Sequence, residues 1–145
     1  MKNYDCLKLE NQLCFPLYAC SKEIVKKYNP FLNKIDLTYT QYIVMIILWE
    51  YGKMNVKDLG NKMYLDSGTL TPLLKKLETK GYIKRTKSCE DERNLIIELT
   101  NKGESLKDKA IDIPNKIGSC LNLDKEDATT LYKLLYRILN NIENN

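Results

Sequence analysis

The sequence predicts one mainly α-helical domain with a small β-hairpin. Along most of the 145 residues, apolar side chains recur at intervals of three or four, which places them on one face of a helix. The pattern becomes strand-like around a polar turn between residues 82 and 99. Apolar residues make up 43% of the chain and charged residues 29%, enough apolar material for one core. The length fits a single domain, residues 1–145.

The first two helices are predicted from periodicity and from a capping signal. Apolar residues at helical spacing run from about residue 7 to 32, and Asn29-Pro30 bends or ends this helix. Thr38 and Gln41 have the spacing of a capping box, which opens a second helix that stops before Gly52.

Two helices joined by a tight turn are expected next. After a short segment at residues 54–56 comes a small helix over 57–63, and then a longer one from Ser67 to Lys80. Gly81 occupies the position of a C-cap glycine. The longer helix has leucines along one face, namely Leu70, Leu73, Leu74 and Leu77.

The hairpin and the last helices complete the chain. Strands at residues 82–87 and 95–99 enclose a charged turn. Thr100 starts a helix that runs to about Ile111, and Pro114 marks an end or a bend. Asp124 caps a final helix with a broad apolar stripe, formed by Leu131, Leu134, Leu135, Ile138 and Ile142.

This order of elements predicts a winged helix-turn-helix at about residues 54–99. It is flanked by long helices at about residues 7–32 and 100–142. The N-terminal helix and the final helix carry more apolar surface than so small a core can cover, so we expect them to hold a two-fold homodimer together.

The composition argues against an enzyme. The chain has no histidine, which removes the usual catalytic triads and histidine-based zinc sites. Its six glycines form no phosphate-binding loop, and its five cysteines show no CxxC spacing. A thiol peroxidase would carry a P-x-x-x-[ST]-x-x-C pattern, which is absent. We therefore expect no metal and no cofactor.

The N-terminus and the apolar runs predict a cytoplasmic protein. No apolar run approaches the roughly 18 residues that span a bilayer. The first residues lack the apolar stretch of a signal peptide. We expect no membrane partner.

The positive charge is concentrated in the middle of the chain. The net charge is +4, and residues 53–110 carry thirteen basic and nine acidic side chains. Within residues 75–87, six basic side chains face one acid, Glu78. Such a cluster is either the footprint of a polyanion or an ordinary solvated face, and charge alone does not separate the two.

The outward face of the Ser67–Lys80 helix is the candidate DNA contact. Small side chains at its start suit a close approach to base edges, and lysines one and two turns later reach phosphates. Pro72 lacks an amide proton, so the helix begins near Thr69 or bends at the proline. The alternative is a surface helix with a polar side. The candidate residues are Ser67, Gly68, Thr69, Thr71, Pro72, Lys75 and Lys76.

Four motifs in order resemble the MarR-type transcriptional regulators. Asp91-Glu92-Arg93 followed by Leu99-Thr100 is similar to the wing signature of that family. Residues 65–78 resemble the recognition helix of its organic hydroperoxide resistance (OhrR) branch. Two further stretches, at residues 11–18 and 37–50, are similar to other parts of the regulators of that branch.

The resemblance implies a homodimeric repressor that binds an inverted-repeat operator in double-stranded DNA. It releases the operator when an organic hydroperoxide oxidises a thiol. In that branch the sensing cysteine matches Cys14, at a helix start that stabilises a thiolate. Its surroundings match Tyr18, Tyr28 and Tyr39, and Phe15 lines the pocket. The alternative is that Cys14 has no sensing role and is a small apolar side chain buried in the core.

Cys120 matches the region where some relatives keep a resolving cysteine. Otherwise a low-molecular-weight thiol condenses with oxidised Cys14. The other three cysteines, Cys6, Cys20 and Cys89, are assigned no role.

The hairpin tip suggests a second DNA contact. Arg93 is suited to a narrow minor groove, with Asp91 holding its guanidinium. Arg85 and Lys87, on the strand leading to the tip, are expected to contact flanking phosphates. The alternative for Asp91 and Arg93 is a surface ion pair of little energetic value.

A second functional hypothesis keeps the fold and the DNA site. In this version a small aromatic ligand binds at the dimer cleft and Cys14 does not sense. Selective alkylation of Cys14 separates the two hypotheses, because only a thiol sensor then loses its response to peroxide.

Overall fold

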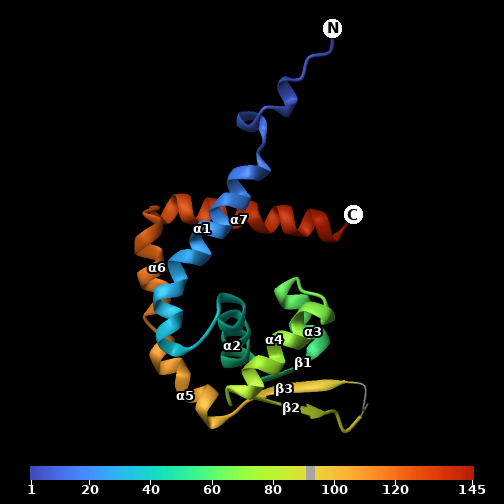
Figure 1. Ribbon diagram of the computed structural model, residues 1–145, viewed down its shortest axis with the longest axis vertical. Helices are drawn as coiled ribbons and strands as arrows, with labels where there is room; N and C mark the ends of the chain where they lie inside the picture. The colour runs from blue at the N-terminus through green and yellow to red at the C-terminus, as the bar shows by residue number, and fades with distance from the viewer. Residues whose placement is uncertain (91–93) are drawn as a thin grey trace. The chain divides into compact units, whose positions relative to one another are not determined.

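The computed structural model of the protein describes residues 1–90 and 94–145 (Figure 1). The chain forms two compact units, Met1–Ile111 and Asp112–Asn145. The first unit contains the elements α1 (Cys14–Leu32), α2 (Tyr39–Tyr51), β1 (Lys53–Asn55), α3 (Val56–Met63), α4 (Ser67–Thr79), β2 (Ile83–Lys87), β3 (Leu95–Leu99) and α5 (Asn101–Ala110). The second contains α6 (Ile113–Leu121) and α7 (Lys125–Glu143).

The N-terminal helix starts later than the sequence predicted. Two short 3-10 turns, Asp5–Leu7 and Leu9–Asn11, precede α1, which begins at Cys14 rather than near residue 7. The side-chain amides of Asn11 and Gln12 donate to main-chain oxygens of the turns, which stabilises turns in place of a continuous helix. At the other end of α1 the helix continues through Pro30 to Leu32.

Helix α2 starts at the predicted capping box. The Thr38 main-chain N–H donates to Gln41 Oε1 at 3.0 Å, and the Gln41 main-chain N–H donates to Thr38 Oγ1 at 3.4 Å. Gly52 follows the helix with a φ of 81°, a conformation that favours glycine. The capping prediction is confirmed.

The strands form a three-stranded antiparallel sheet in the order β1-β3-β2. The predicted hairpin is present, and the short segment after Gly52 adds β1 as a third strand. Ile97 on β3 pairs with Arg85 on β2 and is fully buried, so this line of side chains faces the helices.

The core of the first unit lies between α2, α3, α4 and the sheet. Leu70, Leu74 and Leu77 give α4 a buried face, as the leucine spacing predicted. Gly81 follows the helix with a φ of 82°, which confirms the expected C-cap glycine. The opposite face of α4 does not contribute to this core and is mainly exposed.

The second unit is a pair of helices. Pro114 lies in the first turn of α6, so it opens a new helix rather than only ending the previous one. Asp124 caps α7 as predicted, and its Oδ1 accepts the Asp127 main-chain N–H at 2.8 Å. The predicted apolar stripe of α7 is mostly exposed, with Leu131, Leu134, Ile138 and Ile142 each more than 40% exposed.

In residues 1–90 and 94–145, no helix combines the length and the apolar character needed to cross a membrane.

Candidate functional site

The exposed face of α4 begins at a well-defined helix start. Asp66 Oδ1 accepts the Thr69 main-chain N–H at 2.7 Å, and this hydrogen bond lowers the pKa of Asp66. The helix therefore starts at Ser67 rather than near Thr69, and it contains Pro72. The first residues of α4 are held in a fixed direction.

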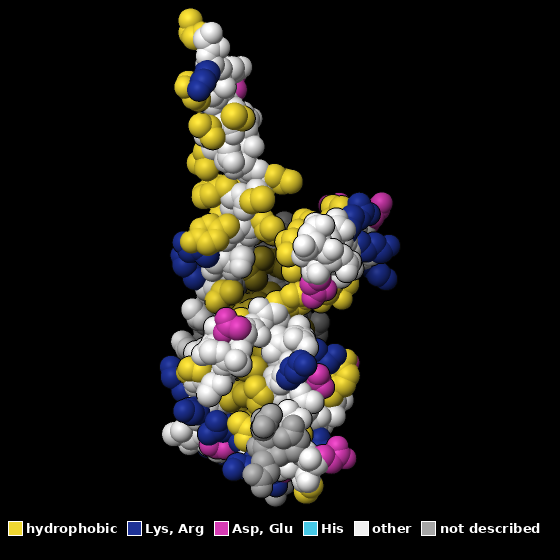
Figure 2. Space-filling model, turned by 90° about the vertical axis from the view of Figure 1, so that its right-hand side faces the viewer, with side chains coloured by type: hydrophobic (Ala, Val, Ile, Leu, Met, Phe, Trp, Pro, Cys, Tyr) yellow, Lys and Arg dark blue, Asp and Glu magenta, His cyan; other side chains and the backbone are white. Residues whose placement is uncertain are grey.

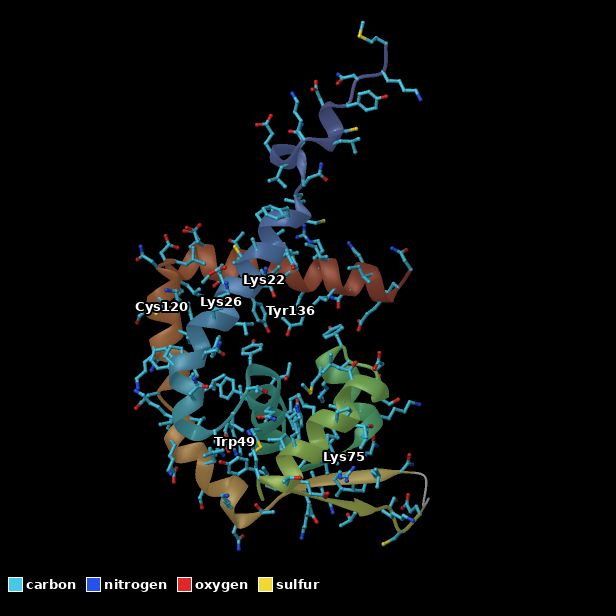
Figure 3. All side chains as sticks on the ribbon, in the orientation of Figure 1. Lys22, Lys26, Trp49, Lys75, Cys120 and Tyr136 are labelled. Carbon is cyan, nitrogen blue, oxygen red and sulfur yellow. The ribbon has the colours of Figure 1, made fainter. Side chains whose placement is uncertain are left out.

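The predicted DNA-contacting residues of α4 lie together on its exposed side, with one exception. Thr71 is half-buried, and its hydroxyl donates to the Ser67 carbonyl at 2.8 Å. Figure 3 shows Lys75 on α4. The exposed members are Ser67, Gly68, Thr69, Pro72, Lys75 and Lys76. Small groups at the helix start and lysines further along form the arrangement that the sequence predicted.

Of the two predicted contacts on β2, one is exposed and the other is engaged internally. Asp91 and Arg93 lie outside the described residues. Lys87 is exposed at the end of β2. The Arg85 side chain is only 21% exposed, and its Nη2 donates to Glu78 Oε1 at 3.0 Å. Arg85 therefore joins β2 to α4, whereas the sequence predicted a phosphate contact for it.

The Arg85–Glu78 pair has two attachments. Besides the side-chain bond, the Arg85 main-chain N–H donates to Glu78 Oε2 at 3.1 Å. The guanidinium hydrogen bond lowers the pKa of Glu78. Arg85 Nε is buried and has no hydrogen-bond partner among the described residues. The pair fixes the direction of β2 relative to α4.

This geometry predicts different consequences for two neighbouring substitutions. Arg85→Met should lower the free energy of unfolding by about 1 kcal/mol and leave the salt dependence of DNA binding unchanged. Lys87→Met should leave stability unchanged and reduce the salt slope by about one. Urea unfolding and DNA titrations at several salt concentrations measure both. A reduced salt slope with unchanged stability in Arg85→Met would instead indicate that Arg85 contacts a phosphate.

Cys14 is exposed at the first residue of α1. At this end of a helix the main-chain N–H groups lack intrahelical partners and favour an anion. Phe15 is 46% exposed and Tyr18, one turn further along, is 60% exposed. The Lys22 ammonium lies 5.2 Å from the centre of the Tyr18 ring, and Lys22 is labelled in Figure 3. The start of α1 is an open surface rather than a closed pocket.

Tyr28 and Tyr39 lie together but far from the thiol of the same chain. Their ring centres are 4.9 Å apart, and the Tyr42 ring centre is 5.9 Å from that of Tyr28. Burial raises the pKa of both Tyr28 and Tyr39, so both phenols are protonated donors at neutral pH. Fourteen helical residues separate Tyr28 from Cys14, which corresponds to about 21 Å. The expected tyrosine cluster around Cys14 does not form within one chain.

The remaining cysteines are also exposed thiols. Cys120 lies on α6 in the second unit, and Cys6, Cys20 and Cys89 lie in the first. In the described part of the chain, no group of three or more cysteine and acidic side chains is placed to hold a metal ion.

Two residues that shape this site were missed from the sequence. Asp66 caps α4, and the Asp-x-x-Thr spacing before a helix is a signal that could have identified it. Glu78 was regarded only as the one acid in a basic cluster. An acid seven residues before an arginine across a helix-to-strand turn gives no local signal, so its pairing with Arg85 required the fold.

Comparison with known proteins gives one family and close relatives. The profile of the SarA/Rot transcriptional regulators matches residues 26–110. The organic hydroperoxide resistance transcriptional regulator of Bacillus subtilis is 49% identical over 136 residues, covering 94% of this chain and 92% of the relative.

Solved structures of AbfR, a protein of Staphylococcus epidermidis, are similar in fold and sequence. Its reduced form bound to DNA has a TM-score of 0.79 and 34% identity, covering 94% of each chain. Its disulfide form has a TM-score of 0.65 and 34% identity, covering 92% of this chain and 93% of that one.

Proposed function

Because this chain belongs to the MarR-type winged-helix transcriptional regulators and matches the SarA/Rot group, we propose that it is a repressor that binds an operator. It releases the DNA when an organic hydroperoxide oxidises Cys14. The family consists of transcriptional regulators rather than enzymes. The observation that carries the proposal is the 49% identity to a hydroperoxide resistance regulator over nearly the whole chain. The exposed thiol at the start of α1 supports it.

The exposed face of α4 is the proposed major-groove contact. The small side chains of Ser67, Gly68 and Thr69 let the start of the helix approach base edges, and Lys75 and Lys76 reach phosphates. Lys87 adds a contact from the wing. Two such helices in a two-fold dimer match an inverted-repeat operator with half-sites about one helical turn apart.

We expect Lys75→Ala and Lys76→Ala to weaken DNA binding evenly across sequences. Each substitution should reduce the slope of log affinity against log salt by about one, because one phosphate contact is lost. Lys26→Ala is the matched control, because Lys26 is an exposed lysine on α1. It should leave both the DNA affinity and its salt slope unchanged. An unchanged slope in both α4 variants would identify this face as an ordinary solvated one.

A second copy of the chain is the proposed cover for the exposed apolar side chains. Figure 2 shows hydrophobic side chains along the N-terminal segment, and Leu13 is 84% exposed. The apolar stripe of α7 is also exposed. Monomeric proteins rarely expose apolar patches of this extent. We expect sedimentation velocity at micromolar concentration to show a dimer, and a stable monomer would contradict this assembly.

The sensing site is completed by the partner in this proposal. Cys14 is exposed and stands about 21 Å along α1 from the tyrosine pair of its own chain. A two-fold dimer can bring Cys14 of one chain to the partner subunit's Tyr28 and the partner subunit's Tyr39. Their protonated phenols can donate hydrogen bonds to the thiolate, and Tyr18 and Phe15 of the same chain add an apolar wall.

The redox step has two stages. The Cys14 thiolate attacks the terminal oxygen of the hydroperoxide and the O–O bond breaks, so that Cys14 becomes a sulfenic acid. The departing alkoxide takes a proton from water and leaves as the alcohol. A second thiol then attacks the sulfenic sulfur, releasing water and forming a disulfide. That thiol belongs to Cys120 or to a small cellular thiol. The disulfide is bulkier than the thiolate and separates the helices at the start of α1, which changes the distance between the two α4 helices.

Fluorescence anisotropy with a DNA duplex tests the proposal. The duplex is selected from a random pool by the reduced protein, and this selected duplex is used throughout. Cumene hydroperoxide with cysteine should release the duplex, whereas salicylate should not. Release by salicylate with no effect of the hydroperoxide would instead support the aromatic-ligand regulator.

A further inference from the structure

The end of α4 is tied to the chain segment that follows α1. Lys80, directly after α4, donates from Nζ to the Asp36 main-chain oxygen at 2.7 Å and to Gln41 Oε1 at 3.0 Å. Its ammonium also lies 3.3 Å from Asp36 Oδ1. These three oxygens match the three protons of an ammonium group.

Both residues that accept hydrogen bonds from Lys80 are held in place by their surroundings. Asp36 has a φ of 55°, which is uncommon for a residue other than glycine, and it stands between buried Ile35 and buried Leu37. Gln41 is 2% exposed and accepts from both Lys80 and the Thr38 main-chain N–H. The ammonium therefore bonds to a rigid turn rather than to a mobile loop.

Neighbouring residues add to the connection. The Tyr82 hydroxyl donates a hydrogen bond to the Ile35 main-chain oxygen at 3.4 Å. The Lys80 main-chain oxygen accepts from Lys102 Nζ at 2.8 Å, which links α5 to the same point. The start of the wing and the end of α4 thus share one attachment to the segment after α1.

Besides these polar bonds, α2 packs against α1 and against α4. Leu32, Leu48 and Leu74 are at most 1% exposed and pack without direction. A set of three hydrogen bonds from one ammonium does fix the distance between its partners. The Lys80 ammonium therefore gives a displacement of the segment after α1 a directional polar connection to the end of α4.

We propose that Lys80 is a positioning residue that couples the position of α1 to the position of the recognition helix α4. The inference deepens the proposed function, since α1 carries Cys14 at its first residue. Movement of α1 after oxidation of Cys14 shifts Asp36, and Lys80 carries the shift to the end of α4. Without Lys80, α1 moves and α4 stays in its DNA-binding position.

Lys80→Met tests the coupling, because methionine keeps a long side chain and removes the three donors. Lys84→Met is the matched control, since Lys84 forms an exposed ion pair with Glu98 at 3.2 Å. The measured quantity is the ratio of the Kd for the selected duplex after and before treatment with cumene hydroperoxide and cysteine. We expect a ratio on the order of 10 to 100 for wild type and for Lys84→Met, and about 1 to 3 for Lys80→Met. A merely structural role would lower the urea midpoint or the reduced affinity and leave the ratio at the wild-type value, which would overturn the proposal.

A second measurement does not depend on peroxide sensing. If Lys80 couples the two helices, DNA that holds α4 also restrains α1. DNA binding should then change the rate at which a maleimide alkylates Cys14 in a variant with the other four cysteines replaced by serine. Lys80→Met should abolish that change. If wild type fails to release on peroxide, the sensing proposal fails, while loss of the DNA effect in Lys80→Met still supports the coupling. The coupling proposal is overturned if DNA does not change the alkylation rate of Cys14 when Lys80 is present, or if DNA still changes it in Lys80→Met.

Discussion

Gly103→Ala is expected to destabilise the protein by about 3 kcal/mol or more. A Cβ atom at Gly103 would lie 2.0 Å from the Tyr82 main-chain oxygen and 3.2 Å from Leu99 Cδ2. The Tyr82 oxygen accepts the main-chain N–H of Thr100, the residue that caps α5, so it cannot withdraw without losing this hydrogen bond. The Gly103 oxygen also accepts from Trp49 Nε1 at 3.0 Å, which ties α5 to α2 (Figure 3). Urea unfolding followed by circular dichroism measures the loss.

Gly118→Ala is the matched control for that substitution. Gly118 lies within α6 and has nothing within 4 Å of an added Cβ. Alanine should therefore raise the free energy of unfolding by about 0.5–1 kcal/mol, because it restricts the unfolded chain. Equal destabilisation by both substitutions would show that the close approach of α5 to Tyr82 is not the cause.

Cys14→Ser is expected to bind the selected duplex as wild type does and to lose its release by cumene hydroperoxide entirely. A serine hydroxyl keeps the size of the side chain and does not react with the oxidant at neutral pH. Cys20→Ser is the control, because Cys20 is an exposed cysteine on the same helix. Cys20→Ser should release as wild type does. Release retained by Cys14→Ser would leave a transcriptional regulator that responds to another signal.

Cys120→Ser separates the two routes to the disulfide. If Cys120 resolves the sulfenic acid of Cys14, this variant should release the duplex only when cysteine is added with the hydroperoxide. Normal release without added cysteine would remove Cys120 from the mechanism and leave the single-cysteine sensor. Anisotropy titrations with and without cysteine measure the difference.

Local signals predicted most of the fold. The capping box at Thr38, the cap at Asp124 and the glycine after α4 depend on neighbours within a few residues, so the sequence pattern contains the whole interaction. The face of α4 was predictable for the same reason, since one helical period decides which side chains share a side.

The features that were missed depend on distant residues or on competing local bonds. The periodic apolar residues before Cys14 resemble a helix, but the amides of Asn11 and Gln12 stabilise turns there. The engagement of Arg85 by Glu78 depends on how β2 lies against α4. The separation of Cys14 from Tyr28, by contrast, follows from the helical rise alone, and the proposed contribution of a second chain to the sensing site rests on it.

A single titration measures whether oxidation of Cys14 releases the DNA. Cumene hydroperoxide and cysteine are added stepwise to the reduced protein on the selected duplex, and each sample is divided between anisotropy and mass spectrometry of the peptide that contains Cys14. We expect the fraction of released DNA to rise in proportion to the fraction of Cys14 in a disulfide. Release while Cys14 remains a free thiol, or full conversion of Cys14 with the DNA still bound, would contradict the account.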